Sequence, residues 1–164
     1  MSAKSPLRRM LSLSADDLAL SLLALPLLCA SHLVIRTVPF RLWRSWVDRV
    51  CGEPPGSFRV GTGARIRPQQ VSHAVARAVR LVPRSRCLVQ ALCGAALFRL
   101  YGFRPQFAIG VRLEARRRML AHAWVVVDGT VRIGWLPDLP LYRQLALEQR
   151  LPAGSAVGAA EARR

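Results

Sequence analysis

The chain has 164 residues, of which 52% are hydrophobic; this composition is sufficient for a packed core and excludes a fully disordered chain. The formal net charge is +16, but Lys4 is the only lysine, and the scattered arginines are not expected to be interleaved with exposed aromatic residues that stack on bases, which argues against nucleic-acid binding. The four cysteines form no CxxC pair or Cys/His cluster and follow no secretory signal, so we expect no metal site, no disulfides and a cytoplasmic location.

The first predicted element is a long uncharged helix. Ser14 suits the N-cap position, and Asp17 would close a capping box and interact favourably with the helix dipole. Residues 18–35 then carry no formal charge, which is just long enough for a membrane span, although Pro26 and several polar side chains count against one. We expect a helix that is buried or touches a membrane and packs on the rest of the chain, with a true span as the open alternative.

Two further helices are predicted before the middle of the chain. Residues 41–50 form a short amphipathic helix, and residues 68–82 place valines and alanines at helical spacing before Pro83 ends the pattern. The Gly- and Pro-rich residues 52–56 between them read as a linker. The predicted division is a helical preface over residues 1–52, a linker and helix over 53–82, a catalytic core over 83–151 and a disordered tail over 152–164.

The core is predicted to contain a helix followed by a small antiparallel sheet. The helix begins at Arg86 or Cys87 and ends near Tyr101, where Gly102 suits the left-handed cap. Asp128 and Gly129 form the strongest two-residue hairpin signal in the chain. The fold class is therefore α+β, with strands expected over residues 105–113, 120–127 and 130–136, a loop over 114–119 and a last short helix within 139–151.

Cys87 and His122 are the candidate catalytic pair. A cysteine nucleophile and its base must be close in space and not in sequence. The reactive thiolate is favoured at a helix N-terminus and beside a cation, and Cys87 follows Arg86 at the head of a helix. The free amides of that helix can donate to an oxyanion, while His122 would take up and return the proton.

The hairpin geometry selects a third residue. If residues 128 and 129 form a two-residue turn, His122 faces Trp135, and Asp128 lies about 20 Å away at about 3.3 Å per residue. Asp138 follows just beyond the residue opposite His122 and can curl back toward the imidazole. We therefore predict that Asp138 orients His122, and that Asp128 serves the turn.

Each of these residue types also has a structural explanation. Buried cysteines are usually small core residues, which is the interpretation favoured for Cys29 and Cys93, and Cys51 lies beside the linker without a functional pattern. His32 and His73 have no partner pattern. Core packing is also favoured for Trp124 and Trp135, which could alternatively wall a site. The functional hypothesis rests on the order Cys, strand, His, strand and Asp, because none of these residues supports it alone.

The residues in this order resemble the transglutaminase-like, papain-related cysteine protease superfamily, and more closely the stand-alone lasso peptide biosynthesis leader peptidases. These form the peptidase half of a split B protein. The resemblance covers roughly residues 83–145. It departs from the family at residues 133–138, which are less acidic, and at Val126, where the family often has Glu. The motifs are Arg86-Cys87-Leu88 with Ala91-Leu92, Gly102 followed by Ile109-Gly110-Val111, and Ala121-His122-Ala123-Trp124-Val125 with Val127-Asp128-Gly129.

The resemblance implies a Cys-His-Asp hydrolase that removes the leader of a ribosomally made and modified lasso precursor peptide. Cys87 would be the nucleophile, His122 the general base and Asp138 the orienting acid. The implied partners are the precursor, a small PqqD-like leader-binding protein and an asparagine-synthetase-like cyclase. No cofactor is expected in this chain, which has no phosphate loop, although ATP dependence is associated with the complex. An acyltransferase or transglutaminase on the same fold, and a non-catalytic membrane-associated scaffold, remain the alternatives.

Overall fold

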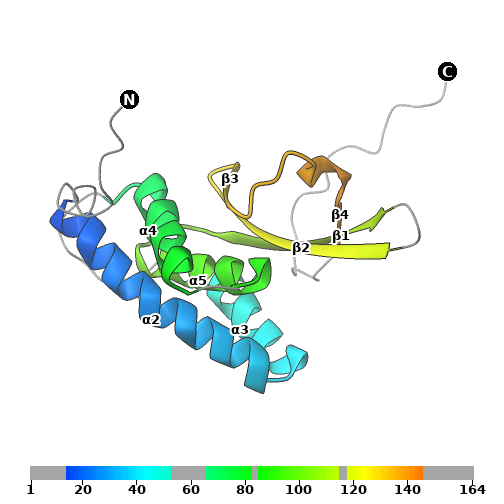
Figure 1. Cartoon of the computed structure of the whole chain (residues 1–164), viewed down its shortest axis with the longest axis horizontal. Helices are drawn as coiled ribbons and strands as arrows, with labels where there is room; N and C mark the ends of the chain where they lie inside the picture. The colour runs from blue at the N-terminus through cyan, green and yellow to red at the C-terminus, as the bar shows by residue number, and fades with distance from the viewer. Residues whose placement is uncertain (1–13, 53–65, 83–84, 115–117, 146–164) are drawn as a thin grey trace.

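The computed structural model describes residues 14–52, 66–82, 85–114 and 118–145. In these residues four helices precede and cover a four-stranded antiparallel sheet of order β3-β2-β1-β4, which confirms the predicted α+β fold. Figure 1 shows the helices gathered at one end of the sheet, with the paired strands β1 and β2 extending beyond them. The elements are α2 (Ala15–Thr37), α3 (Phe40–Gly52), α4 (Pro68–Leu81), α5 (Cys87–Leu100), β1 (Gln106–Glu114), β2 (Arg118–Val127), β3 (Thr130–Ile133), a 3-10 helix (Leu139–Leu141) and β4 (Arg143–Gln144).

Helix α2 starts at the predicted cap. The Ser14 hydroxyl accepts from the Asp17 amide at 3.2 Å and donates to the Asp17 carboxylate at 2.9 Å, which satisfies one of the free amides of the first turn. One face of the helix is packed, because Leu20, Ala24 and Leu28 have no exposed surface. The predicted packing of this helix on the rest of the chain is therefore confirmed.

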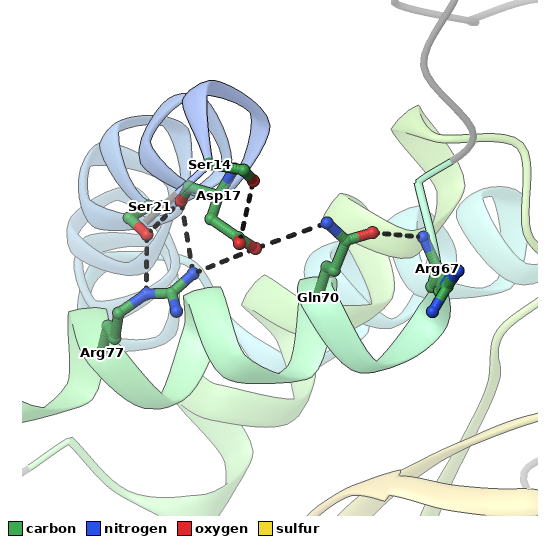
Figure 2. Close-up of polar contacts among 6 residues, drawn as sticks. All are labelled: Ser14, Asp17, Ser21, Arg67, Gln70 and Arg77. Atoms are coloured by element: carbon green, nitrogen blue, oxygen red, sulfur yellow. Dashed lines mark hydrogen bonds and ion pairs between the residues drawn. The ribbon is translucent and has the colours of Figure 1, made fainter. Parts of the chain in front are cut away.

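A polar cluster joins α2 to α4 (Figure 2). Arg77 donates through Nε to the Ser21 hydroxyl at 2.8 Å and through a terminal nitrogen to the Asp17 carbonyl at 3.2 Å. The Asp17 carboxylate lies 3.8 Å from the same guanidinium and accepts from Gln70 at 3.5 Å. Side chains at one end of α2 therefore fix its position against α4, in addition to the apolar contacts along its length.

Helix α5 is the centre of the core. Every residue from Ala91 to Phe98 is buried, and Gly94 lies so close to Ile133 of β3 that an added methyl group would overlap that side chain. The helix ends with the predicted glycine cap, since Gly102 has φ +82° and the next amide donates to the Phe98 carbonyl at 3.0 Å. The absence of a side chain at residue 94 thus allows the helix to approach the sheet.

The β2–β3 hairpin has the predicted turn but not the predicted register. Asp128 and Gly129 both have positive φ, as a tight hairpin turn requires, and Val127 pairs with Thr130. A bulge follows, so that Val125 pairs with Ile133 where a regular ladder would place residue 132. The predicted pairing of His122 with Trp135 is therefore wrong, and the strand ends at Ile133 instead of residue 136.

The predicted last helix is also wrong in the described residues. Residues 139–141 form one 3-10 turn, and residues 143–144 pair with Gly110 and Val111 as strand β4. The Leu145 amide adds a hydrogen bond to the Ile109 carbonyl at 2.8 Å. The open edge of β1 offers unpaired backbone groups that outweigh a weak helical pattern. The predicted tail over residues 152–164 lies outside the described residues.

One hydrophobic core is shared by the helices and the sheet. It draws Leu20, Ala24 and Leu28 from α2 and residues from every other helix, together with one face of the sheet. Helix α2 is therefore part of the same core as α5, although the two lie in different predicted segments. The predicted division at residues 52 and 82 stays an interpretation of composition.

Candidate active site

Cys87 is the first residue of α5, as predicted, and its side chain is partly exposed. The segment before it is held by side chains: Gln90 donates to the Ser85 carbonyl at 2.9 Å, and the Ser85 hydroxyl donates to the Val82 carbonyl at 3.1 Å. The amides of the first helical turn have no partner within the helix and carry partial positive charge. Cys87 therefore lies where an anion, such as a thiolate or an oxyanion, is stabilised.

His122 is held in one orientation on β2. Its Nε2 lies 2.7 Å from the Gly134 carbonyl, and its ring stacks on Trp124 with centroids 6.2 Å apart at 17°. Tyr142 also lies beside the ring, with the two centroids 5.7 Å apart. Because a carbonyl can only accept, Nε2 carries a proton, and in the neutral ring Nδ1 then keeps its lone pair. This is the tautomer that a base acting through Nδ1 requires.

Gly134 holds this carbonyl in place, and only glycine fits the position. Its φ is +76°, and an added Cβ would lie 2.5 Å from the Ala123 carbonyl oxygen. The bulge in β3 brings residue 134 to the side of β2 where His122 lies. Sequence reasoning missed Gly134, because its only signal was a glycine inside the strand predicted over residues 130–136.

The Asp138 carboxylate contacts a partner other than the His122 ring. Its carboxylate forms an ion pair with Arg112, and the Arg112 guanidinium lies over the Tyr142 ring at 5.2 Å. Tyr142 in turn contacts His122. In the described part of the chain no hydrogen bond or ion pair joins Asp138 to His122. The role of Asp138 in orienting the imidazole stays a prediction, because the one hydrogen bond on that ring goes to Gly134.

Cys87 and His122 lie at the same level along the sheet. Gly94 of α5 lies against Ile133, which pairs with Val125 of β2. The short link from α5 to β1 makes α5 and β2 run in the same direction. Cys87 lies seven helical residues before Gly94, and His122 lies three strand residues before Val125. Each of these separations is about 10 Å along its element. Both candidate residues are therefore displaced equally from the Gly94 contact.

The two residues lie on opposite faces of β2. Ala123 and Val125 point into the core with α5, so the pleat directs His122 and Trp124 to the other face. There the Trp124 ring covers Gly110, the strand partner of His122. Within the residues that the structure describes, the Cys87 thiol has no hydrogen bond to His122. The thiol and the imidazole thus lie at one level along the sheet, with the imidazole directed to the face of β2 that α5 does not cover.

A comparison with known protein families matches residues 34–146 to the family described as the transglutaminase-like superfamily. The match covers more than half of the chain and includes Cys87, His122 and Asp138. The chain belongs to the transglutaminase-like superfamily. This superfamily includes cysteine proteases and acyltransferases. No curated protein and no solved structure matches the chain.

The remaining cysteines of this transglutaminase-like domain divide between core and surface. Cys93 is fully buried in α5, as predicted, and its thiol lies 3.6 Å from the Ala24 carbonyl. Burial, and then the nearby Cys29, raises the pKa of Cys93 from 9.0 to about 12, so its thiol stays protonated near neutral pH. Cys29 is exposed on α2, so its predicted core position is wrong. All four cysteines are free.

The other candidate residues outside the predicted pair differ in how exposed their side chains are. Trp124 is buried, as predicted for a packing residue, whereas Trp135 is 67% exposed and its predicted core position is wrong. His73 is exposed, and His32 has a buried Nδ1 without a partner. Among the described residues no group of three His, Cys, Asp or Glu side chains could hold a metal ion. Arg112 and Tyr142 of the transglutaminase-like domain, which border His122, were missed because their proximity depends on the pairing of β4 with β1.

Proposed function

We propose that the chain is a cysteine peptidase that removes the leader from a ribosomally synthesised lasso precursor peptide. The observation that carries the proposal is the His122 imidazole, held through Nε2 with Nδ1 free, in a superfamily that includes cysteine proteases. The helix-start position of Cys87 supplies the matching nucleophile. The finer assignment to leader removal rests on the resemblance of the motifs around these two residues.

The reaction follows from the groups that the two residues offer. Nδ1 of His122 takes the thiol proton, and the Cys87 sulfur attacks the carbonyl carbon of the scissile amide. Amides at the start of α5 donate to the resulting oxyanion. Collapse breaks the C–N bond, and the imidazolium protonates the leaving amine of the core peptide. Water, deprotonated by His122, then releases the leader as a carboxylic acid and restores the thiol.

This mechanism requires a movement that joins the thiol and the imidazole. β3 pairs only with residues 125–127 of β2, so the β3-facing side of β2 at His122 has no strand partner. Catalytic hydrogen bonds are often long without substrate and tighten in the complex. We infer that the bound precursor, together with a separate leader-binding protein, brings the start of α5 toward His122 on this side, while Nε2 keeps its hydrogen bond to the Gly134 carbonyl. Oxidative crosslinking of Cys87 in a His122→Cys variant tests whether the two positions meet.

The proposed partners are the precursor peptide, the leader-binding protein and an asparagine-synthetase-like cyclase that uses the freed amine. The net charge of +16 suits an acidic leader or an acidic partner. Asp138 would act on His122 through Arg112 and Tyr142, as a positioning residue. No cofactor is required by the steps above.

The decisive experiment is an intact-mass assay of the precursor incubated with the leader-binding protein and the full chain. We expect free leader with the wild-type chain and with Cys29→Ala, a control that removes an exposed thiol of α2 outside the candidate site. Cys87→Ala should abolish the product. Equal cleavage by Cys87→Ala would overturn the assignment of the nucleophile, whereas a leader–amine conjugate would indicate an acyltransferase.

A second candidate function is a non-catalytic scaffold of a peptide-maturation complex. The observation that favours it is the separation of Cys87 and His122 across β2. In this case the Cys87→Ala chain would remain folded and would support maturation as well as the wild type. Failure of cleavage by both chains, with the partner present and the fold verified by circular dichroism, would favour this candidate.

A further inference from the structure

The outward face of α2 is exposed but uncharged. Leu18, Leu22, Pro26, Cys29 and Leu33 follow one another at intervals of three or four residues, so they lie along one side of the helix. We call these five residues the outer stripe. Leu22 is 66% and Leu33 61% exposed. The water-facing side of a surface helix is normally polar or charged, and this side carries no charge from residue 18 to residue 35.

A second apolar feature is a groove at the C-terminal half of α2. The groove has a volume of about 280 Å³ and lies between α2 and α3, with Ala30 and Val34 on one wall and Leu42 and Trp46 on the other. Leu42 is 62% and Trp46 40% exposed. Exposed apolar surface of this extent marks an interaction site with a membrane or a protein.

The opposite face of α2 is fully engaged by the rest of the chain. Leu20, Ala24 and Leu28 are buried in the shared core, and Arg77 bonds to Ser21 and Asp17 (Figure 2). In the described part of the chain α2 is the one helix that is long and apolar enough to cross a membrane. Crossing a membrane would remove α2 from α4 and α5 and break the Arg77 hydrogen bonds. Lying on the surface of a bilayer would leave these contacts intact.

The charge around the stripe favours an anionic surface. Arg36 in the last turn of α2 and Arg41 in α3 are exposed at the groove end of the stripe. Arginine side chains beside an apolar helix face, with a tryptophan at its border, are typical of helices that lie in the headgroup region. A net charge of +16 opposes the pairing of two copies and attracts anionic lipid.

We propose that the outer stripe, together with Leu42 and Trp46, lies flat on an anionic phospholipid bilayer and holds the folded chain at the membrane surface. The stripe enters the acyl boundary, and Arg36 and Arg41 pair with lipid phosphates. This proposal does not depend on the peptidase activity, because none of its residues belongs to the candidate site.

Vesicle flotation of the full chain tests the proposal. The chain should float with vesicles that contain phosphatidylglycerol and remain at the bottom with pure phosphatidylcholine. Leu22→Glu and Leu33→Glu should each weaken partitioning of the chain onto vesicles about tenfold or more, because each places a charged side chain in the apolar part of the bilayer. Leu113→Glu is the matched control, since Leu113 is 72% exposed on β1 and the charge change is the same. Arg36→Gln and Arg41→Gln should each weaken binding about fivefold, and added salt should do the same.

The outcomes separate lipid contact from the other occupants. Release by alkaline carbonate is expected for a helix lying on the surface, and resistance to carbonate would overturn the proposal in favour of a span. Absence of flotation with either vesicle would overturn it in favour of a protein partner. Equal loss with Leu113→Glu would overturn it as well, since the effect would not belong to the stripe. Thermal unfolding of each variant verifies that the chain remains folded.

Discussion

At the scale of single residues, the orientation of His122 comes from the backbone. The Gly134 carbonyl accepts from Nε2 at 2.7 Å, and the position tolerates no side chain because of Ala123. Asp138, which the sequence suggested for this task, is paired with Arg112. A histidine that acts as a base needs a defined tautomer, and a carbonyl that accepts one proton selects it as a carboxylate does.

We expect His122 to carry its proton on Nε2. Long-range ¹H–¹⁵N correlation of the ring, assigned with a His122→Gln variant, should show a protonated Nε2 and an unprotonated Nδ1. Gly134→Ala should convert this pattern to a mixture of tautomers, because the added Cβ displaces the carbonyl. Gly129→Ala is the matched control: it has a similar positive φ of +71° but open space around it. Equal effects of both substitutions would contradict the assignment.

Cys93 should make the fold sensitive to alkaline pH. Burial, followed by Cys29, raises the pKa of its thiol to about 12, so above pH 9 the unfolded chain loses a proton that the folded chain retains. The free energy of unfolding should therefore fall with rising pH by about 1.4 kcal/mol per unit from this group, between its unfolded and folded pKa. Urea unfolding at a series of pH values measures the slope, which should be shallower in Cys93→Ala. An unchanged slope would exclude Cys93 as the cause.

At the scale of elements, the pattern of the sequence predicted helices and strands better than their pairing. The cap at Ser14, the helix starting at Cys87 and the turn at Asp128 all follow from local chemistry. The bulge opposite Val125 and Val126 and the pairing of β4 do not, because they depend on contacts between segments. The local features of the site were therefore predictable, whereas the neighbours of His122 were not.

The contact between α5 and β3 should couple two residues. An alanine at position 94 would overlap the Cδ1 of Ile133, so Gly94→Ala should destabilise the fold although alanine favours helix. Ile133→Val removes that methyl group and should relieve the overlap. A double-mutant cycle by urea unfolding should give a favourable coupling of about 1–2 kcal/mol. Additive effects would show that the helix and strand separate freely.

At the scale of the whole molecule, one hydrophobic core includes residues on both sides of the predicted boundaries at residues 52 and 82. The superfamily match begins at residue 34, near the end of α2, yet α2 supplies three residues without any exposed surface. Composition could not reveal that α2 packs in the core, because an uncharged helix can have the same composition whether it packs on protein or on lipid. The same helix therefore serves as a wall of the core on one face and as an exposed apolar surface on the other.

A chain that begins at residue 38 should fail to fold. Removing α2 would expose the facing side chains of α4 and α5, and loss of several fully buried leucine and alanine contacts costs more than a domain of this size can spare. Circular dichroism and thermal unfolding measure the result, with a chain that begins at residue 14 as the control. A cooperative transition in the shorter chain would show that α2 is an appendage.

The backbone acceptor at Gly134 has a consequence for how the site tolerates sequence change. A carboxylate that orients a histidine is removed by many single substitutions at one codon. A carbonyl is present in every residue, so substitution can only shift it, and here the shift requires a side chain at Gly134 or a loss of the β3 bulge. Replacing the Asp138 carboxylate would therefore leave the acceptor of the imidazole proton in place.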